Sequence, residues 1–327
     1  MADVARLAGV STSTVSRALR RAESVSPALR ARVHEAVAAL GYVPNSMAGG
    51  LAAARTRTVG VIVPSLVNSF FAATLDAMTE RLAPRGYQIM LGNSAYSPET
   101  EAALVNSFLS WSPAAIVLTG QAHARATMQR LLGAGIPIVE MWELGENALD
   151  SLVGFSHRAV GRLAARHLLD RGRRRIAFVG AALDEDRRAA QRSAGFAEVV
   201  REQLGRPAVV VALPQRASAA TGGLALAELL ARHPDVDGVA FSNDAMALGG
   251  LFECQRRGIG VPADLALVGF GDLDFAAWST PALSTIRPPR REIGLAVADH
   301  LLQRFDDPHA GPTTIDVGFE LVPRASS

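Results

Sequence analysis

The segment that decides the fold is residues 3–26, which read DVARLAGVSTSTVSRALRRAESVS. Its apolar residues recur at intervals of three and four, which predicts two short helices with one apolar stripe each; they are Val4, Ala5, Ala8, Val15, Ala18 and Leu19. Gly9 lies where the chain must turn, because glycine readily adopts the left-handed backbone of a tight turn. Ser11 or Thr12 can cap the second helix with its hydroxyl oxygen. We therefore expect two helices that close on each other around a tight turn.

The start of the second predicted helix carries small polar side chains and one cation, namely Thr12, Ser13, Thr14, Ser16 and Arg17. In a helix-turn-helix, this part of the second helix meets base edges in the major groove of DNA. Small hydroxyls let the backbone approach the groove, and an arginine can reach a phosphate or a guanine. The alternative is an ordinary helical hairpin with a corner rich in serine and threonine. We favour DNA binding and predict that these five residues contact DNA.

A third helix is predicted to start at Ser26-Pro27 and to end at Gly41. Its apolar residues can cover the first two helices; they are Leu29, Val33, Ala36, Val37 and Leu40. The chain then reads YVPNSMAGGLA over residues 42–52. The order and spacing of these segments resemble the lactose/purine repressor family, with its D-V-A-x-x-A-G-V-S-x-x-T-V-S-R and L-G-Y-x-P-N-x-x-A-x-x-L patterns. The resemblance implies an all-α helix-turn-helix domain over residues 1–44 and a homodimer that binds a pseudo-palindromic operator in double-stranded DNA.

Residues 45–57 are expected to form a hinge and linker, with a short hinge helix over residues 45–54. In the family, the matching helix folds only on DNA and inserts a leucine into the minor groove. The resemblance therefore implies that Asn45 and Leu51 contact the operator. Gly49 and Gly50 depart from the pattern, because each glycine costs a helix interior about 0.5–1 kcal/mol relative to alanine. A plain flexible linker is the alternative.

The positive charge is concentrated at the N-terminal end. Residues 1–57 hold eight arginines and three acids, a balance of +5, so the remainder carries −3 of the total of +2. All 33 basic residues are arginine, which we attribute to a GC-rich genome. Cys254 is the single cysteine, so neither a disulfide framework nor a thiolate metal site is expected, and we expect no cofactor. No apolar run reaches membrane-spanning length, and we expect a cytoplasmic protein without a membrane partner.

From Thr58 onward, apolar runs of strand length alternate with helical stretches. The predicted strands are 58–63, 87–91, 115–118 and 136–139, then 176–180, 208–211, 238–241 and 265–270. Such alternation predicts α/β lobes with doubly wound parallel sheets. This pattern resembles the family's periplasmic-binding-protein-like core for effector binding and dimerisation, here residues 58–327, in which the chain crosses between two lobes. We place the crossings near Phe155, Ile286 and Pro312, so that lobe one holds 58–155 and 287–311, and lobe two holds 156–286 and 312–327.

Ligands of open α/β sheets bind beyond the carboxyl ends of the strands, and the loops there are rich in hydroxyl, amide and guanidinium groups. The predicted effector contacts are Asn68, Phe70, Asn93, Glu140, Arg187, Arg192, Asn243 and Asp272. Arg192 matches the arginine of the family's R-x-x-G-F motif. Asn243 matches its N-D-x-M-A-x-G segment, which a helix-capping role alone would also explain. Gly271 replaces the first acid of the family's V-G-[FY]-D-[DN] segment. A pocket with one acid fewer, and with Arg187, Arg188 and Arg192 in one loop, should tolerate an anionic effector.

Further segments resemble the gluconate-utilisation repressor branch of the family, among them GYQIML at 86–91 and AGIPIVE at 134–140. Gluconate is a sugar acid, so this resemblance agrees with the charge of the site, although its arginines can also be solvated. The alternatives are a neutral-sugar effector, a purine corepressor, and a sugar-binding protein without DNA function. The chain lacks a P-loop, a dinucleotide turn, a nucleophile elbow and a metal-binding helix motif, so we do not expect an enzyme.

Overall fold

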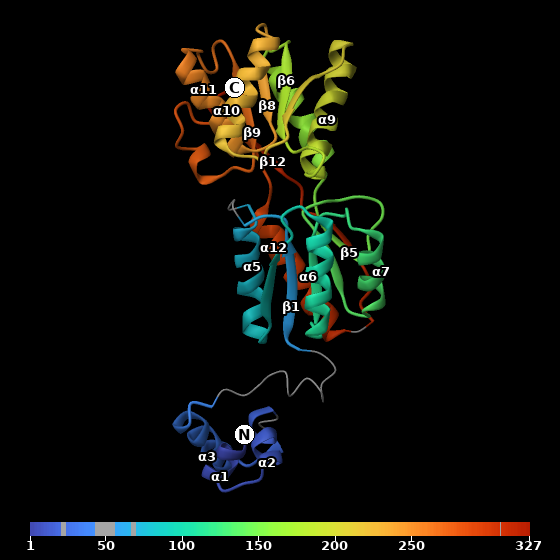
Figure 1. Ribbon diagram of the computed structural model, residues 1–327, viewed down its shortest axis with the longest axis vertical. Helices are drawn as coiled ribbons and strands as arrows, with labels where there is room; N and C mark the ends of the chain where they lie inside the picture. Colours follow the sequence, from blue (N-terminus) through green and yellow to red (C-terminus); the bar gives the residue numbers. More distant parts are fainter. Residues whose placement is uncertain (21–23, 43–55, 67–69, 308) are drawn as a thin grey trace. The chain divides into compact units, whose positions relative to one another are not determined.

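The computed structural model describes residues 1–20, 24–42, 56–66, 70–307 and 309–327. The chain divides into two units, Met1–Thr56 and Arg57–Ser327, and Figure 1 shows the elements of each. The predicted hinge helix, with Asn45 and Leu51, lies outside the described residues. Among the described helices, none is long and apolar enough to cross a membrane.

The N-terminal unit contains three helices, α1 (Ala2–Leu7), α2 (Thr12–Arg20) and α3 (Pro27–Ala39). Gly9 makes the turn between α1 and α2 with a φ of +63°. Val4, Val15 and Val33, one from each helix, are completely buried together. Leu40, which we expected to help cover the first two helices, is 46% exposed, because α3 ends at Ala39 and Leu40 follows it as the C-cap.

Lobe one is built on a six-stranded parallel sheet in the order β11-β5-β4-β3-β1-β2. Its strands are β1 (Thr58–Val63), β2 (Gln88–Asn93), β3 (Ala115–Thr119), β4 (Ile138–Met141), β5 (Ser151–Gly154) and β11 (Thr314–Asp316). Its helices are α5 (Ala72–Leu82), η2 (Ala83–Arg85), α6 (Pro98–Ser110), α7 (Arg125–Gly133) and α12 (Arg290–Asp306). In β1, Val61 packs with α5 and α12, whereas Ile62 packs with α6 and α7 on the other face. Both faces of the sheet are therefore covered, as a parallel sheet requires.

Lobe two repeats the scheme with the strand order β12-β10-β9-β8-β6-β7, in which only the β10–β12 pair is antiparallel. Its strands are β6 (Ile176–Ala181), β7 (Val209–Leu213), β8 (Gly238–Phe241), β9 (Ala266–Phe270), β10 (Ser284–Arg287) and β12 (Glu320–Val322). Its helices are α8 (His157–Asp170), α9 (Arg187–Leu204), α10 (Ala219–Arg232), α11 (Asp244–Arg257) and η3 (Asp274–Ala276). Phe178 of β6 packs with α8 and α9, and Val179 packs with α10 and α11. Figure 1 shows these helix pairs on opposite sides of the sheet.

Three segments cross between the lobes. They lie between β5 and α8, between β10 and α12, and between β11 and β12. The third crossing comes later than the expected position near Pro312, because residues 314–316 pair with β5 of lobe one before the chain returns to β10 as β12. Residues 312–316 therefore belong with lobe one.

Candidate functional site

The polar side of α2 is accessible in the N-terminal unit. The five predicted DNA contacts on this helix are exposed or half-buried, namely Thr12, Ser13, Thr14, Ser16 and Arg17. The Ser11 hydroxyl oxygen lies 2.8 Å from those of Ser13 and Thr14, and it accepts the Thr14 backbone N–H at 3.2 Å, which caps the helix. Arg17 Nη2 donates to the Thr14 hydroxyl at 3.4 Å. The start of α2 thus presents hydroxyl groups and a guanidinium on a capped helix end.

Residues of both lobes line a cavity of about 130 Å³, several times the roughly 10–15 Å³ that a single water needs. It lies at the carboxyl ends of strands from both sheets, where β1 and β9 end near Phe70 and at Phe270. Aromatic rings, three arginines and two carboxylates share its wall. The cavity therefore combines apolar surface with charged groups, as sites for small polar ligands do.

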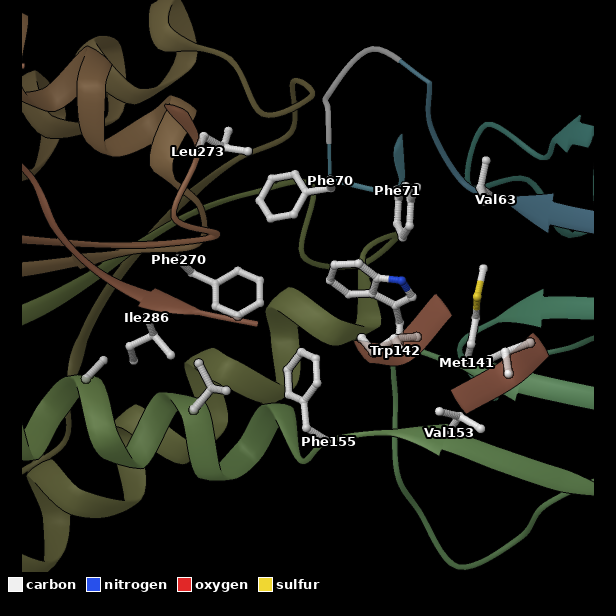
Figure 2. Packing of buried hydrophobic residues seen from close by; sticks show 14 of the residues in the cluster. Val63, Phe70, Phe71, Met141, Trp142, Val153, Phe155, Phe270, Leu273 and Ile286 are labelled. Atoms are coloured by element: carbon white, nitrogen blue, oxygen red, sulfur yellow. The ribbon is translucent and has the colours of Figure 1, made fainter. Parts of the chain in front are cut away.

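Aromatic rings from both lobes meet in this wall (Figure 2). Phe70 of lobe one stacks on Phe270 of lobe two, with ring centroids 6.0 Å apart and an interplanar angle of 17°. Trp142, which follows β4, meets Phe70 edge-on at 6.4 Å and Phe71 at 5.1 Å. The lobes thus touch through rings that exclude water from one side of the cavity.

Arg192 is the buried cation of the site. Its Nη1 donates to Nδ1 of His157 at 2.8 Å, its Nη2 donates to the Ser242 carbonyl at 2.9 Å, and its guanidinium lies 4.2 Å from the centre of the Phe270 ring. Burial lowers the pKa of Arg192 to about 10, so it stays charged at neutral pH. Among the described residues, its Nε atom has no hydrogen-bond partner. The guanidinium is therefore fixed in place with donor capacity left for a ligand.

His157 is held in one neutral form. Its Nε2 lies 2.8 Å from the Trp142 carbonyl and donates to it, because Nδ1 accepts from Arg192. Burial and the charges of Arg192 and Arg188 hold the pKa of His157 well below its usual range. His157 is therefore a fixed acceptor that orients Arg192.

Glycines allow α8 and α9 to approach closely enough to place Arg192. A Cβ on Gly161 would lie 1.8 Å from the Arg192 carbonyl oxygen, and a Cβ on Gly195 would lie 1.9 Å from the Arg158 carbonyl oxygen. Phe196, the next residue, is completely buried in the core. The three fixed positions of the R-x-x-G-F pattern thus have separate tasks: a cation in the cavity, a close helix contact and a core ring.

Two further arginines surround the cavity. Arg188 donates to the Thr119 carbonyl of lobe one at 3.2 Å, and Arg216 donates to the Ala95 carbonyl at 2.7 Å and lies 3.3 Å from Glu185. The Asp186 carboxylate caps α9 by accepting the Ala189 N–H at 3.1 Å. Within the described part of the chain, neither Arg188 nor Arg192 forms an ion pair with a carboxylate. The cavity therefore carries positive charge that the protein does not neutralise by direct pairing.

Comparison with known proteins identifies the whole arrangement. Residues 1–45 match the model for bacterial regulatory proteins of the lacI family, and residues 165–327 match the periplasmic binding protein-like domain. A crystal structure of a LacI-family transcriptional regulator from Silicibacter pomeroyi is 36% identical, with a TM-score of 0.92, over 99% of this chain and 98% of that one. This chain belongs to the LacI family of transcriptional regulators.

Two other relatives support the assignment to the LacI family. The HTH-type transcriptional regulator GntR of Pseudomonas aeruginosa is 40% identical over 326 residues, which cover 99% of this LacI-family chain and 94% of the relative. The crystal structure of the lac repressor dimer bound to operator and the anti-inducer ONPF is 25% identical, with a TM-score of 0.84, over 99% of this chain and 97% of that one. These relatives are regulators of transcription and not enzymes.

In this LacI-family core, the cavity brings together three of the predicted effector residues: Phe70, Arg192 and Asn243. Asn243 is the N-cap of α11, and its Oδ1 accepts the Met246 N–H at 3.0 Å, so both of the roles that the sequence allowed remain open to it. Asn68 lies outside the described residues.

Arg187 and Asn93 do not line the cavity. We expected Arg187, Arg188 and Arg192 in one loop, but α9 begins at Arg187, so Arg188 and Arg192 share one face of a helix and Arg187 is exposed beside it. Asn93 ends β2 with an exposed side chain, whose Oδ1 accepts the Ala95 N–H at 3.1 Å. The structure therefore corrects both expectations.

Glu140 and Asp272 also interact with other groups of the protein and do not line the cavity. Glu140 is buried in β4, where one carboxylate oxygen accepts the Leu149 N–H at 2.7 Å. Asp272 lies between Arg287 and Arg324, each 2.6 Å from one of its oxygens, so it joins the crossing strand β10 to the C-terminal segment. Neither residue lines the cavity, and both oxygens of Asp272 and one oxygen of Glu140 are hydrogen-bonded to other groups of the protein.

The cavity wall also contains residues that are not among the predicted effector contacts: Tyr96, Trp142, His157, Arg188 and Arg216. Arg188 was expected in one loop with Arg192, and the structure instead places both on one face of α9, four residues apart. Trp142 follows β4 with a φ of +71°, a left-handed backbone that no sequence pattern announces. His157 and Tyr96 belong to no motif that we recognised.

A second buried charged group lies in lobe one near this site. His123 contacts the Glu101 carboxylate at 2.7 Å through Nδ1, and its Nε2 lies 3.1 Å from the Gly120 carbonyl and 3.4 Å from Glu140. Burial alone would lower the pKa of His123, but the two carboxylates outweigh burial and raise it to about 9. His123 is therefore a buried cation at neutral pH that ties the loop after β3 to α6 and β4.

This charge predicts a pH-dependent stability. Because the pKa of His123 is higher in the folded chain than its ordinary value of 6.5, its contribution is complete below pH 6.5 and disappears as the pH rises through about 9. The contribution is roughly 3 kcal/mol at most. Urea unfolding between pH 6.5 and 9.5 should show this decline in the free energy of unfolding of the wild type, and His123→Gln should lack it. Parallel curves for the two proteins would refute the assignment.

Proposed function

We propose that this chain is a repressor of transcription whose affinity for operator DNA is controlled by a small sugar acid such as gluconate. The observation that carries this proposal is the cavity between the lobes, with the guanidiniums of Arg188 and Arg192 unpaired to carboxylates. An effector carboxylate supplies the missing charge partner in a site that aromatic rings shield from water on one side. The segments that resemble gluconate-utilisation repressors and the 40% identity to the regulator GntR support the same effector class.

Different residues of the cavity bind different parts of the effector. Arg188 and Arg192 bind the carboxylate, and Asn243 offers its Nδ2 group to a hydroxyl, since its Oδ1 caps α11. Phe70 and Trp142 face the C–H groups of the sugar chain. Guanidinium recognition of an anion combined with aromatic walls suits a polyol acid better than a purine, which would need a flat slot between rings.

The DNA-binding part acts as a helix-turn-helix. Thr12, Ser13, Thr14, Ser16 and Arg17 meet the major groove, and Asn45 and Leu51 contact the operator from the hinge. A homodimer places two such units on a pseudo-palindromic operator, as in the similar lac repressor dimer on its operator. The protein works in the cytoplasm, where the operator is, and effector binding changes the geometry of the lobes and thereby the affinity for DNA.

The test is operator affinity with and without gluconate. Fluorescence anisotropy with a labelled operator should show weaker binding as gluconate rises, and calorimetry should show that operator weakens gluconate binding by the same factor, because coupling is reciprocal. Sorbitol, glucose and guanine serve as the neutral-polyol, neutral-sugar and purine arms. Tighter operator binding with guanine, or a response to a neutral compound only, would replace the sugar-acid proposal.

The role of Arg17 gives a separate prediction. Arg17→Ala should weaken specific operator binding by roughly 10- to 100-fold, the cost of one arginine contact to a guanine or phosphate. Arg30→Ala removes the same charge from an exposed position on α3 and is the matched control. Anisotropy titrations against operator and scrambled DNA separate the two. Equal losses for both variants on both DNAs would show that Arg17 contributes net charge alone.

A further inference from the structure

Gly271 has a backbone that places it directly against the other lobe. Its φ is +131°, and its N–H donates to the Ile286 carbonyl at 2.8 Å, which fixes the loop after β9. A Cβ built on Gly271 would lie 2.5 and 2.6 Å from Cζ and Cε1 of the Phe70 ring. Such distances are far inside van der Waals contact, so any side chain at residue 271 displaces that ring.

The Phe70 ring has little freedom to move aside. It is 8% exposed, stacked on Phe270 and set edge-on against Trp142 (Figure 2). Because interiors are close-packed, a ring held by neighbours on several sides is displaced only at a cost of about 1–3 kcal/mol. Gly271 and Phe70 therefore form a matched pair across the two lobes.

Residue 271 also lies beside a buried carboxylate, that of Asp244. Asp244 is completely buried, and its Oδ2 would lie 3.5 Å from a Cβ at residue 271. The two Asp244 oxygens accept from the Thr285 hydroxyl at 2.6 Å and from the Leu273 N–H at 2.8 Å. Burial raises the pKa of Asp244 to about 6. A second carboxylate here would lie close to the buried carboxylate of Asp244.

We propose that Gly271 is a specificity-determining position: without a side chain it seats the Phe70 ring, which makes that side of the cavity uncharged and leaves the arginines to select an anionic effector. In this arrangement the Phe70 ring fills the space that a side chain at residue 271 would occupy. Without an acid at residue 271, a neutral polyol has one hydrogen-bond acceptor fewer in the site. The carboxylate of a sugar acid, in contrast, meets no negative charge there. This inference rests on the proposed effector class and deepens it.

The charge part is tested with an isosteric pair. Gly271→Asp and Gly271→Asn have the same size and both displace the ring, so the difference between them isolates the negative charge. By calorimetry, Gly271→Asp should bind gluconate at least tenfold more weakly than Gly271→Asn, with the difference shrinking at high salt. Equal gluconate affinities for the two variants would overturn the proposal that residue 271 selects charge.

The steric part is tested without any ligand. Thermal unfolding of wild type, Gly271→Ala, Phe70→Ala and the double variant forms a cycle in which the backbone strain of alanine at residue 271 cancels. The loss of Tm caused by Gly271→Ala should fall by at least half in the Phe70→Ala background. Gly258→Ala, at a φ of +70° with open space around it, is the strain control and should show no coupling to Phe70. An unchanged loss of Tm in the two backgrounds would overturn the matched pair.

These two experiments separate the inference from the proposed function. If the wild type binds no sugar acid, the effector proposal and the charge selection fail together, and the unfolding cycle still decides whether Gly271 seats Phe70. If the wild type binds gluconate and the cycle shows no coupling, the proposed function stands and the inference fails.

Discussion

Arg192→Leu is expected to lower gluconate affinity at least about 100-fold while operator affinity stays within about twofold of the wild type. Leucine removes the buried guanidinium, and hydrogen bonds to charged groups contribute about 1.5–3 kcal/mol each. It also leaves the Ser242 carbonyl and Nδ1 of His157 without their donors. Calorimetry measures the effector affinity, and anisotropy measures operator binding, to which a residue of the core contributes no direct contact.

Two controls sharpen this experiment. Arg187→Ala removes an exposed arginine from the same helix end and should change gluconate affinity by less than about twofold. Arg192→Lys keeps a charge, but a single ammonium cannot reproduce the planar fork that bridges His157 and Ser242, so an intermediate loss is expected. If Arg192→Leu still releases operator at the wild-type gluconate concentration, Arg192 does not bind the effector.

Gly195→Ala is expected to lower the free energy of unfolding by about 3 kcal/mol, the upper range for overpacking a well-filled interior. The added Cβ would lie 1.9 Å from the Arg158 carbonyl oxygen, and that neighbour is backbone, which cannot rotate away. The helices α8 and α9 must therefore separate, and Arg192 moves with them. Urea unfolding gives the stability, and a parallel loss of gluconate affinity is expected in the folded variant.

Gly133→Ala is the matched control for this substitution. Gly133 is the last residue of α7, and a Cβ there would meet nothing within 4 Å. Alanine at this position should leave the stability unchanged or raise it by about 0.5–1 kcal/mol, through helix propensity and a less flexible unfolded chain. A loss below about 1 kcal/mol for Gly195→Ala would mean that α8 and α9 are not in backbone contact.

The regular elements were predictable because their burial is periodic. The strand predicted at 58–63 is β1, and the one at 238–241 is β8, since buried parallel strands read as continuous apolar runs. The strands β5, β10, β11 and β12 escaped prediction. β5 and β10 mix polar and apolar residues within four positions, so neither reads as a continuous apolar run. β11 and β12 are three-residue edge strands whose residues are exposed or half-buried. The third crossing was misplaced for the same reason.

The site was predictable only where a local pattern fixes it. Arg192 and Asn243 belong to segments whose spacing is set by helices α9 and α11, and both line the cavity. Asp272 was misassigned because Arg287 and Arg324, which hold it, lie far along the chain. Glu140 likewise contacts His123 and accepts a hydrogen bond from the Leu149 N–H. Which polar group a carboxylate meets depends on tertiary packing, which spacing along the chain does not encode.

The glycine contacts of lobe two recur on its second face. There α10 and α11 touch in the same way, with a Cβ on Gly222 placed 2.1 Å from the Met246 carbonyl oxygen and one on Gly249 placed 1.8 Å from that of Ala219. Main chains in direct contact have no side chains between them whose rotamers could let the helices slide. We therefore expect lobe two to move as one body, with any rotation against lobe one taken up by the torsion angles of the three short connecting segments.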